Sequence, residues 1–218
     1  MKERKVSIIF KSLVILSLLA GILLNVINCT SISAILSYYT LQSNIICLAM
    51  FIGTMVAISL KKNYRSSDIY ALLKGGVVIA ILVTAITYQI ALVPNNFNMD
   101  IGYTMQTKRY WANLFVHNIS PVMVVVDYLL FDAKGKFKYY YPFVWLFFPL
   151  NYVLYVYIYN LLGGRFFGIG GSRDLAYIFL DYNQIGYMGV VKSISLMAVF
   201  ILGISYVLVF LDRRGQNK

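Results

Sequence analysis

The sequence holds a single histidine, His117, and several hydroxyl side chains that could serve as its partner. A hydroxyl is a weak nucleophile until a base removes its proton, and imidazole is the commonest such base. On a helical wheel with about 100° per residue, His117 shares one sector with four other polar side chains, namely Asn113, Ser120, Asp127 and Tyr128. This polar stripe indicates either a chemical function or a histidine that joins neighbouring helices, and the residues leave both readings open.

A second polar stripe contains Thr40. The side chains that share its helical face are also polar or small: Ser43, Asn44, Cys47 and Thr54. A threonine inside a helix usually bonds back to a carbonyl three or four residues earlier, so Thr40 is not a strong candidate by itself. Equal candidates for a nucleophilic hydroxyl are Ser37, Ser43 and Ser120.

The elements that carry these stripes are predicted to lie in a membrane. Of the 218 residues, 60% are hydrophobic and 12% are charged, and the mean hydropathy is +0.73. Soluble domains carry about 25% charged residues, so this composition excludes an ordinary soluble domain. It also excludes a disordered chain, which would have few apolar residues, and two cysteines are too few for a disulfide framework.

Six apolar stretches are each long enough to cross about 30 Å of hydrocarbon as a helix. They cover residues 7–27, 38–60, 69–92, 111–131, 141–161 and 187–211. Transmembrane strands would be about 10 residues long and would alternate in polarity, which these stretches do not. We therefore predict an all-α fold, a six-helix bundle that forms one membrane domain over residues 1–218. Between the last two spans, the glycine-rich segment 162–186 is expected to turn and lead into a short interfacial piece.

The lysines and arginines predict the orientation. Twelve of them lie before the first span, in the two even-numbered connections or after the last span, and four lie in the odd-numbered connections. Cytoplasmic loops carry the excess of positive charge, so both termini are expected in the cytoplasm, with the chain multi-pass in the plasma or cell membrane. This explains the net charge of +11 without a nucleic acid partner. Three further lysines within or beside spans, Lys11, Lys74 and Lys192, are expected to extend their ammonium groups to the headgroups.

Depth in the membrane brings the two stripes together. The second and fourth spans both run from outside to inside, with Thr40 about three residues and His117 about six residues below the start. At 1.5 Å per residue these depths are roughly 5 and 9 Å. If the two helices are neighbours, the hydroxyl and the imidazole can meet, with the imidazole uncharged. The sequence permits this nucleophile–base pair without requiring it.

Several motifs in order resemble a known family. The second span opens with Tyr38-Tyr39-Thr40-Leu41-Gln42-Ser43-Asn44, and the fourth with Trp111-Ala112-Asn113-Leu114-Phe115-Val116-His117, followed by Pro121. The fifth span carries Trp145, Pro149 and Tyr152, and Tyr177-Ile178-Phe179-Leu180-Asp181 with Gly186-Tyr187 precedes the sixth. Together, across residues 38–190, these motifs resemble the androgen-induced protein family of six-helix membrane proteins and its bacterial relatives.

The resemblance implies a membrane-embedded threonine hydrolase. Animal members of that family cleave fatty acid esters of hydroxy fatty acids with a threonine near the outer start of the second helix and a histidine in the fourth. Those positions match Thr40 and His117. The expected activity is hydrolysis of lipid esters of the fatty-acyl class, with Thr40 as nucleophile and His117 as base.

Five further residues are candidates for a supporting or substrate-binding role. An oxyanion needs hydrogen-bond donors, and Gln42, Asn44 and Asn113 are close enough in sequence to supply them, with Ser43 beside them. Asp181 is expected either to orient the imidazole or to cap the last helix.

We expect no cofactor and no metal site, because one histidine, one glutamate and two distant cysteines are too few for zinc. The expected partners are membrane lipids and a lipid ester or another hydrophobic small molecule; the residues leave the oligomeric state open. The alternative function is a non-catalytic component that binds or transports a small molecule, in which the polar stripes line a cavity.

Overall fold

The computed structural model describes residues 2–92, 108–168 and 171–215. Its α-helices are α1 (Lys2–Ile27), α2 (Ile32–Leu36), α3 (Tyr39–Ser59), α4 (Asp68–Thr87), α5 (Lys108–Leu114), α6 (Ser120–Phe131), α7 (Tyr141–Leu161) and α8 (Tyr182–Arg214). Two π-helical turns, η1 (Tyr88–Leu92) and η3 (Phe115–Ile119), extend α4 and join α5 to α6, and η4 (Ile178–Leu180) is a 3-10 turn. The short strands β1 (Phe166–Gly168) and β2 (Gly171–Arg173) pair antiparallel.

The predicted all-α bundle is confirmed. Within the described residues, six helices are long and apolar enough to cross a membrane, and the α5, η3 and α6 segments together make one of them. Helix α8 opens at Tyr182 with a short turn that Asp181 caps by accepting a hydrogen bond from the Asn183 amide (3.0 Å). The backbone then breaks at Gly186 (φ +70°), so the continuous part of the helix begins at Tyr187, as predicted. The glycine-rich connection forms the β1–β2 hairpin and η4, which agrees with the expected turn followed by a short non-spanning piece.

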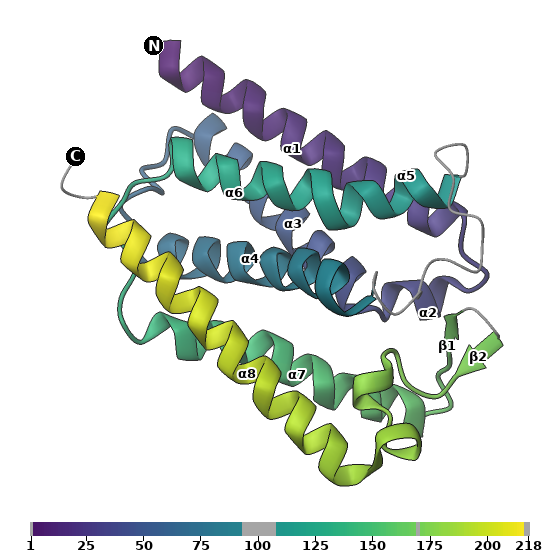
Figure 1. Cartoon of the computed structure of the whole chain (residues 1–218). Coiled ribbons are helices and arrows are strands. Elements are labelled where there is room, and N and C mark those ends of the chain that lie inside the picture. The colour runs from purple at the N-terminus through teal and green to yellow at the C-terminus, as the bar shows by residue number, and fades with distance from the viewer. Residues whose placement is uncertain (1, 93–107, 169–170, 216–218) are drawn as a thin grey trace.

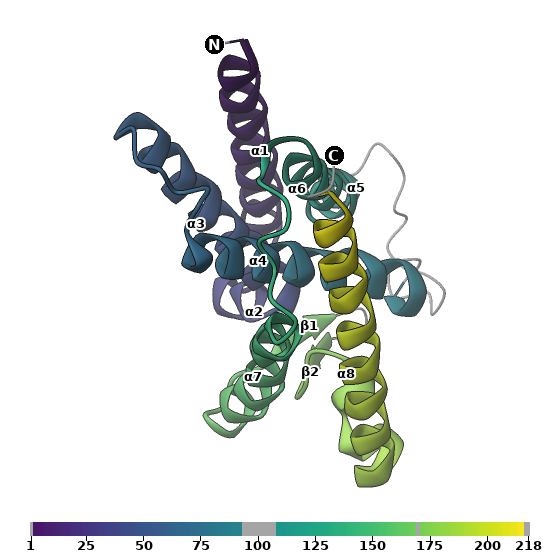
Figure 2. The same ribbon diagram turned by 90° about the vertical axis from the view of Figure 1, so that its left-hand side faces the viewer.

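Helix α4 lies at the centre of the bundle (Figures 1 and 2). It packs against α3, α6, α7 and α8. Helix α1 packs against α3, α5 and α6. The most apolar part of α4 is accordingly more buried than that of any other described span. Close contact with α7 depends on Gly75, because a Cβ there would overlap the Trp145 ring.

Two lysines expected at the headgroups lie instead in the protein interior. The Lys11 ammonium contacts both oxygens of the Asp127 carboxylate, at 2.6 and 2.7 Å, and Lys74 contacts the same carboxylate at 2.7 Å. Lys74 also lies 3.3 Å from the carboxylate of Asp132, which accepts a hydrogen bond from Tyr70 (2.7 Å). The expectation was wrong for both lysines, because buried acidic partners on α6 and at its end outweigh exposure to the headgroups.

The described ends of the chain lie at the same end of the bundle. The start of α1 and the end of α8 are both on the left in Figure 1, the side that faces the viewer in Figure 2. Asp212 near the end of α8 accepts hydrogen bonds from the Tyr128 hydroxyl (2.7 Å) and the Phe137 amide (2.8 Å). These contacts attach α8 to α6 and to the connection between α6 and α7, at the end of the bundle where α1 begins.

Candidate functional site

Thr40 and His117 meet inside the bundle. The Thr40 Oγ1 atom lies 3.2 Å from the His117 Nε2 atom, and both side chains are more than nine-tenths buried. Thr40 is the second residue of α3, and His117 lies in η3 within the fourth span. The expected contact between neighbouring helices is therefore confirmed, whereas a catalytic role for the pair stays a prediction.

The first turn of α3 positions Thr40. Tyr38 has an extended backbone and ends the preceding segment, and its carbonyl accepts the first hydrogen bonds of the helix, from the amides of Leu41 and Gln42. One turn later, Ser43 and Asn44 both donate to the Thr40 carbonyl, at 3.0 and 2.8 Å. These bonds hold the backbone of Thr40 from the side of the helix that faces the bundle interior.

A π-helical turn positions His117. The amide of Ser120 donates to the Phe115 carbonyl, five residues earlier, which widens the helix at this point. The next residue, Pro121, has no amide hydrogen, so the same spacing would leave the Val116 carbonyl without a backbone donor. The Asn44 side chain supplies that donor at 3.2 Å. Asn44 thus bonds the backbone on both sides of the Thr40–His117 pair.

Helix α1 approaches this π-helical turn closely. A Cβ atom at Gly21 would lie 2.8 Å from the Val116 side chain and 3.0 Å from that of Phe115, which is too close. One turn earlier in α1, the hydroxyls of Ser17 and Ser120 form a buried hydrogen bond of 2.8 Å. The absence of a side chain at Gly21 therefore allows α1 to support the turn that carries His117.

The hydrogen bonds of the imidazole determine which nitrogen carries the proton. His117 Nδ1 lies 3.2 Å from the Asn113 carbonyl oxygen, which can only accept a hydrogen bond. Nδ1 is therefore the donor, and Nε2 of the neutral ring is left as the acceptor. The Thr40 hydroxyl in turn donates to Nε2. This arrangement is the one in which the imidazole can remove the proton of the hydroxyl.

Tyr88 covers one face of the imidazole. The two rings are stacked with their centroids 3.9 Å apart and an angle of 17° between their planes. Tyr88 comes from η1, which extends the central helix α4. The ring of His117 is thus fixed in orientation by Tyr88 and by the Asn113 carbonyl, and its Nε2 atom faces Thr40.

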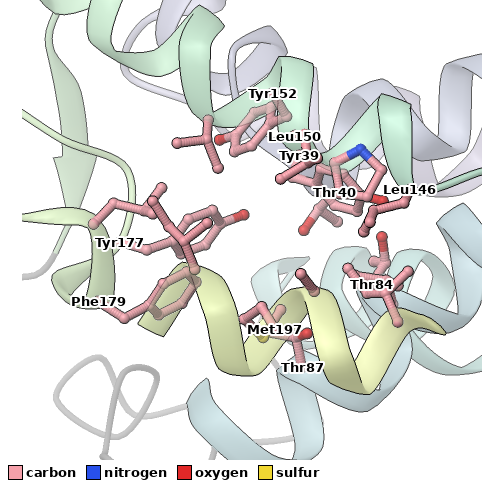
Figure 3. A pocket seen from close by; sticks show the side chains of 17 residues that line it. Tyr39, Thr40, Thr84, Thr87, Leu146, Leu150, Tyr152, Tyr177, Phe179 and Met197 are labelled. Carbon is pink, nitrogen blue, oxygen red and sulfur yellow. The ribbon is translucent and has the colours of Figure 1, made fainter. Parts of the chain in front are cut away.

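A mostly apolar cavity opens on the other side of Thr40 (Figure 3). Measured as the space open to the centre of a water molecule, its volume is about 70 Å³. Its wall comes from the start of α3, from α4, α7 and α8, and from residues 177–180, and it includes Tyr39, Thr40, Tyr152, Tyr177 and Met197. His117 is not among the lining residues, so the histidine lies behind Thr40 and the threonine alone of the pair faces the cavity.

Several hydroxyls line this cavity without a satisfied hydrogen bond. Those of Tyr39, Tyr152 and Thr87 are buried and find no partner of good geometry among the described residues. Thr84 differs, since its hydroxyl bonds to that of Ser43 at 2.7 Å. Buried hydroxyls usually have a partner, so this cavity offers polar groups to a ligand.

Tyr177 brings a further hydroxyl next to Thr40. Its side chain is buried, and its hydroxyl lies against the Thr40 side chain, the Tyr152 hydroxyl and the Tyr39 backbone (Figure 3). Burial raises the pKa of Tyr177 above its ordinary value, and the neighbouring Tyr38 acts in the same direction. The phenol is therefore protonated at physiological pH and can donate a hydrogen bond.

The five supporting candidates divide into those near the pair and those away from it. Ser43, Asn44 and the backbone of Asn113 contact the pair, but the Asn44 amide is already engaged with two carbonyls. Gln42 is half-buried and does not line the cavity, because it lies about 200° around the helix from Thr40. Asp181 accepts from Asn183 and Gln184 and caps α8, and the Asn113 carbonyl takes the place next to the imidazole.

Two tyrosines at the site, Tyr88 and Tyr177, received no role from sequence reasoning. Tyr152 and Tyr177 lie in motifs that carry the family resemblance, and Tyr88 lies at the outer end of a span, where aromatic residues are ordinary. The signal that could have singled out Tyr177 is its place in an apolar segment, 175–180, that is too short to span a membrane.

The fold and the site define the class of the protein as an α-helical, multi-pass membrane bundle with a buried threonine–histidine pair beside an apolar cavity. In comparisons with family models, with curated proteins and with solved structures, nothing matched the chain.

Proposed function

We propose that the protein is a membrane-embedded threonine hydrolase that acts on lipid esters of the fatty-acyl class. The observation that carries this proposal is the Thr40–His117 contact, with the hydroxyl as donor and Nε2 as acceptor. The nucleophile faces the cavity, and the base lies behind it, shielded by Tyr88.

The first half of the reaction transfers the acyl group to the protein. The Thr40 oxygen attacks the ester carbonyl carbon while His117 Nε2 takes the hydroxyl proton. The bond between the carbonyl carbon and the leaving oxygen then breaks. The imidazolium returns its proton to that oxygen, so an alcohol leaves and an acyl-threonine ester remains.

The second half releases the acid. A water molecule attacks the acyl-threonine carbonyl, and His117 Nε2 takes one of the protons of the water. The bond between the carbonyl carbon and the Thr40 oxygen breaks, and Thr40 recovers its proton from the imidazolium. The net change is one ester and one water converted to one alcohol and one carboxylic acid, with the protein restored.

The surroundings of the pair support a lipid substrate. The cavity wall is largely aliphatic and aromatic, and the helices around it are of membrane-spanning length. In this proposal the ester group lies in the cavity beside Thr40, and the rest of the acyl chain remains in the bilayer. The proposed setting is the plasma or cell membrane, with lipids as the partners.

Hydrolysis of long-chain acyl esters by the purified protein tests this proposal. Thr40→Ala is expected to abolish turnover, His117→Ala to lower kcat by about 100-fold or more, and Thr40→Ser to keep part of it. The matched control is Thr54→Ala, because Thr54 is a buried threonine on the same helix that bonds only back to the Met50 carbonyl (2.8 Å). Turnover that survives Thr40→Ala, or that falls equally in Thr54→Ala, would contradict the proposal.

A non-catalytic binding or transport component is the second candidate. The observation that favours it is the set of unsatisfied hydroxyls of Tyr39, Tyr152 and Thr87 in the cavity wall, which would serve a ligand without any reaction. Binding of long-chain lipids without turnover, and without a covalent adduct at Thr40, would move this candidate ahead.

A further inference from the structure

Two tyrosine hydroxyls lie together beside Thr40 in the wall of this mostly apolar cavity. The side chains of Tyr152 and Tyr177 are 5% and 8% exposed, and they come from α7 and from the segment just before η4. The Tyr177 hydroxyl lies against the Thr40 side chain and the Tyr152 hydroxyl (Figure 3). The Tyr152 hydroxyl faces the same place without a hydrogen bond of good geometry. Such a group gains free energy from a ligand that accepts its proton.

The start of α3 adds backbone donors at the same place. The amides of Leu41 and Gln42 donate to the carbonyl of the N-cap residue Tyr38, at 3.1 Å each. The amides of Tyr39 and Thr40 precede them and have no acceptor within the helix, as is general at helix N-termini. The Tyr39 backbone lies next to both tyrosine hydroxyls. The positive end of the helix dipole therefore coincides with the two phenols.

The hydrogen bonds around Thr40 run in one direction. His117 Nδ1 donates to the Asn113 carbonyl, and Thr40 donates to Nε2, which leaves the lone pairs of the Thr40 oxygen for a donor. Tyr177 is the neighbouring donor. A carbonyl group brought to the Thr40 oxygen for attack places its own oxygen among the same donors.

We propose, resting on the hydrolase function above, that Tyr177 and Tyr152 together with the start of α3 form the oxyanion site of this cavity. Both hydroxyls donate to the carbonyl oxygen of the bound ester, and these bonds strengthen as negative charge develops on that oxygen during attack by Thr40. This assignment replaces Gln42, Asn44 and Asn113, which were the donors suggested by sequence position.

The chemistry of the phenols also sets the ligand class. Tyrosine hydroxyls are uncharged donors, so they suit the neutral carbonyl of an ester. No lysine or arginine lines the cavity among the described residues. The site therefore suits an uncharged ester as substrate.

A kinetic experiment tests the role of the two hydroxyls. Tyr177→Phe and Tyr152→Phe are each expected to lower kcat about 100-fold and to raise KM no more than about tenfold, because the bond matters most in the transition state. The matched control is Tyr155→Phe on the same helix, whose hydroxyl bonds to that of Ser37 (2.7 Å) and does not line the cavity. Equal effects in all three variants would overturn the proposal, since they would indicate a structural loss.

A binding experiment tests the site without catalysis. In Thr40→Val protein, the probes are a long-chain methyl ketone, which has a neutral carbonyl, and the alkane of equal length. Adding Tyr177→Phe or Tyr152→Phe is expected to weaken ketone binding about fivefold to tenfold and to leave alkane binding unchanged. Equal weakening of both probes, or of neither, would overturn the proposal.

The two experiments separate the failure of this proposal from the failure of the hydrolase function. If wild-type protein turns over no ester but ketone binding still depends on Tyr177, the hydrolase function is wrong and the carbonyl site stands. If turnover requires Thr40 but neither kcat nor ketone binding responds to Tyr177 or Tyr152, the hydrolase function stands and the oxyanion assignment is wrong.

Discussion

At the scale of single residues, the geometry of His117 is the feature with the most chemical content. A histidine that only joined two helices could use either nitrogen toward either neighbour. Here the Asn113 carbonyl, which can only accept, assigns the proton to Nδ1 and leaves Nε2 to accept from Thr40. Both the tautomer and the ring orientation are those that a general base requires.

The protonation of Tyr177 gives a prediction for alkaline pH. Burial raises its pKa in the folded protein, so the neutral phenol stabilises the fold below the ordinary tyrosine pKa of about 10. That stabilisation is lost as the pH rises from there through the higher folded value. The difference in thermal stability between wild type and Tyr177→Phe, measured in detergent, should thus be constant from pH 7 to about 9.5 and shift against wild type above about pH 10. A shift confined to neutral pH would be inconsistent with a buried, protonated phenol.

At the scale of elements, the π-helical turn η3 connects the packing of the bundle to the site. Pro121 and the five-residue spacing leave a carbonyl that Asn44 satisfies, and Gly21 lets α1 approach the turn. Changes in α1 should therefore reach the Thr40–His117 contact without touching either residue.

Gly21→Ala tests this connection. The added Cβ would lie 2.8 Å from the Val116 side chain, so we expect the free energy of unfolding to fall by about 1–3 kcal/mol. Ester turnover is expected to fall as well, because the turn that carries His117 is displaced. Gly53→Ala is the control, because a Cβ there meets nothing within 4 Å and alanine favours the helix. Thermal unfolding and turnover of the two variants give the comparison, and a Gly21→Ala protein as stable and active as wild type would refute the role of close packing.

The spans and the relative depth of Thr40 and His117 can be predicted from the sequence, whereas η3 and the position of Tyr177 cannot, for a physical reason. Apolar stretches of about 20 residues predict the six spans, and equal depths place Thr40 opposite His117. A helical wheel assumes regular turns, so it does not anticipate η3. It also treats Tyr177 as part of a connection, since only the fold brings residues 175–180 back against the start of α3.

At the scale of the whole molecule, a buried ion cluster ties three helices together. Lys11 of α1 and Lys74 of α4 share the Asp127 carboxylate of α6, and all three side chains are almost fully buried. From the sequence, no acidic partner can be assigned to either lysine, and an unpaired lysine near the end of a span is most simply placed at the headgroups. The pairing of these lysines with Asp127 depends on which helices are neighbours, and the amino-acid composition does not determine that.

Asp127→Ala should destabilise the bundle strongly. It leaves two buried ammonium groups without their shared carboxylate, at a cost of about 3–5 kcal/mol. Asp68→Ala is the control, since it removes an exposed ion pair with Lys138, which contributes little to stability. Denaturant unfolding in detergent measures both, and similar values for the two variants would show that the cluster does not hold the helices together.

The orientation of the molecule has a separate test. The positive-charge bias predicts that reporters placed after Lys62 and Lys138 report from the cytoplasm and that one placed after Gly163 reports from outside. A cytoplasmic signal from the Gly163 position would contradict the predicted orientation.

Covalent labelling shows whether Thr40 is a nucleophile that His117 activates. Purified protein is treated with a long-chain fluorophosphonate, and the modified residue is located by mass spectrometry of its peptides. We expect an adduct on Thr40 that is absent in Thr40→Ala, strongly reduced in His117→Ala and unchanged in Thr54→Ala. An adduct on another residue, or no adduct under conditions that label a known hydrolase, would contradict the account.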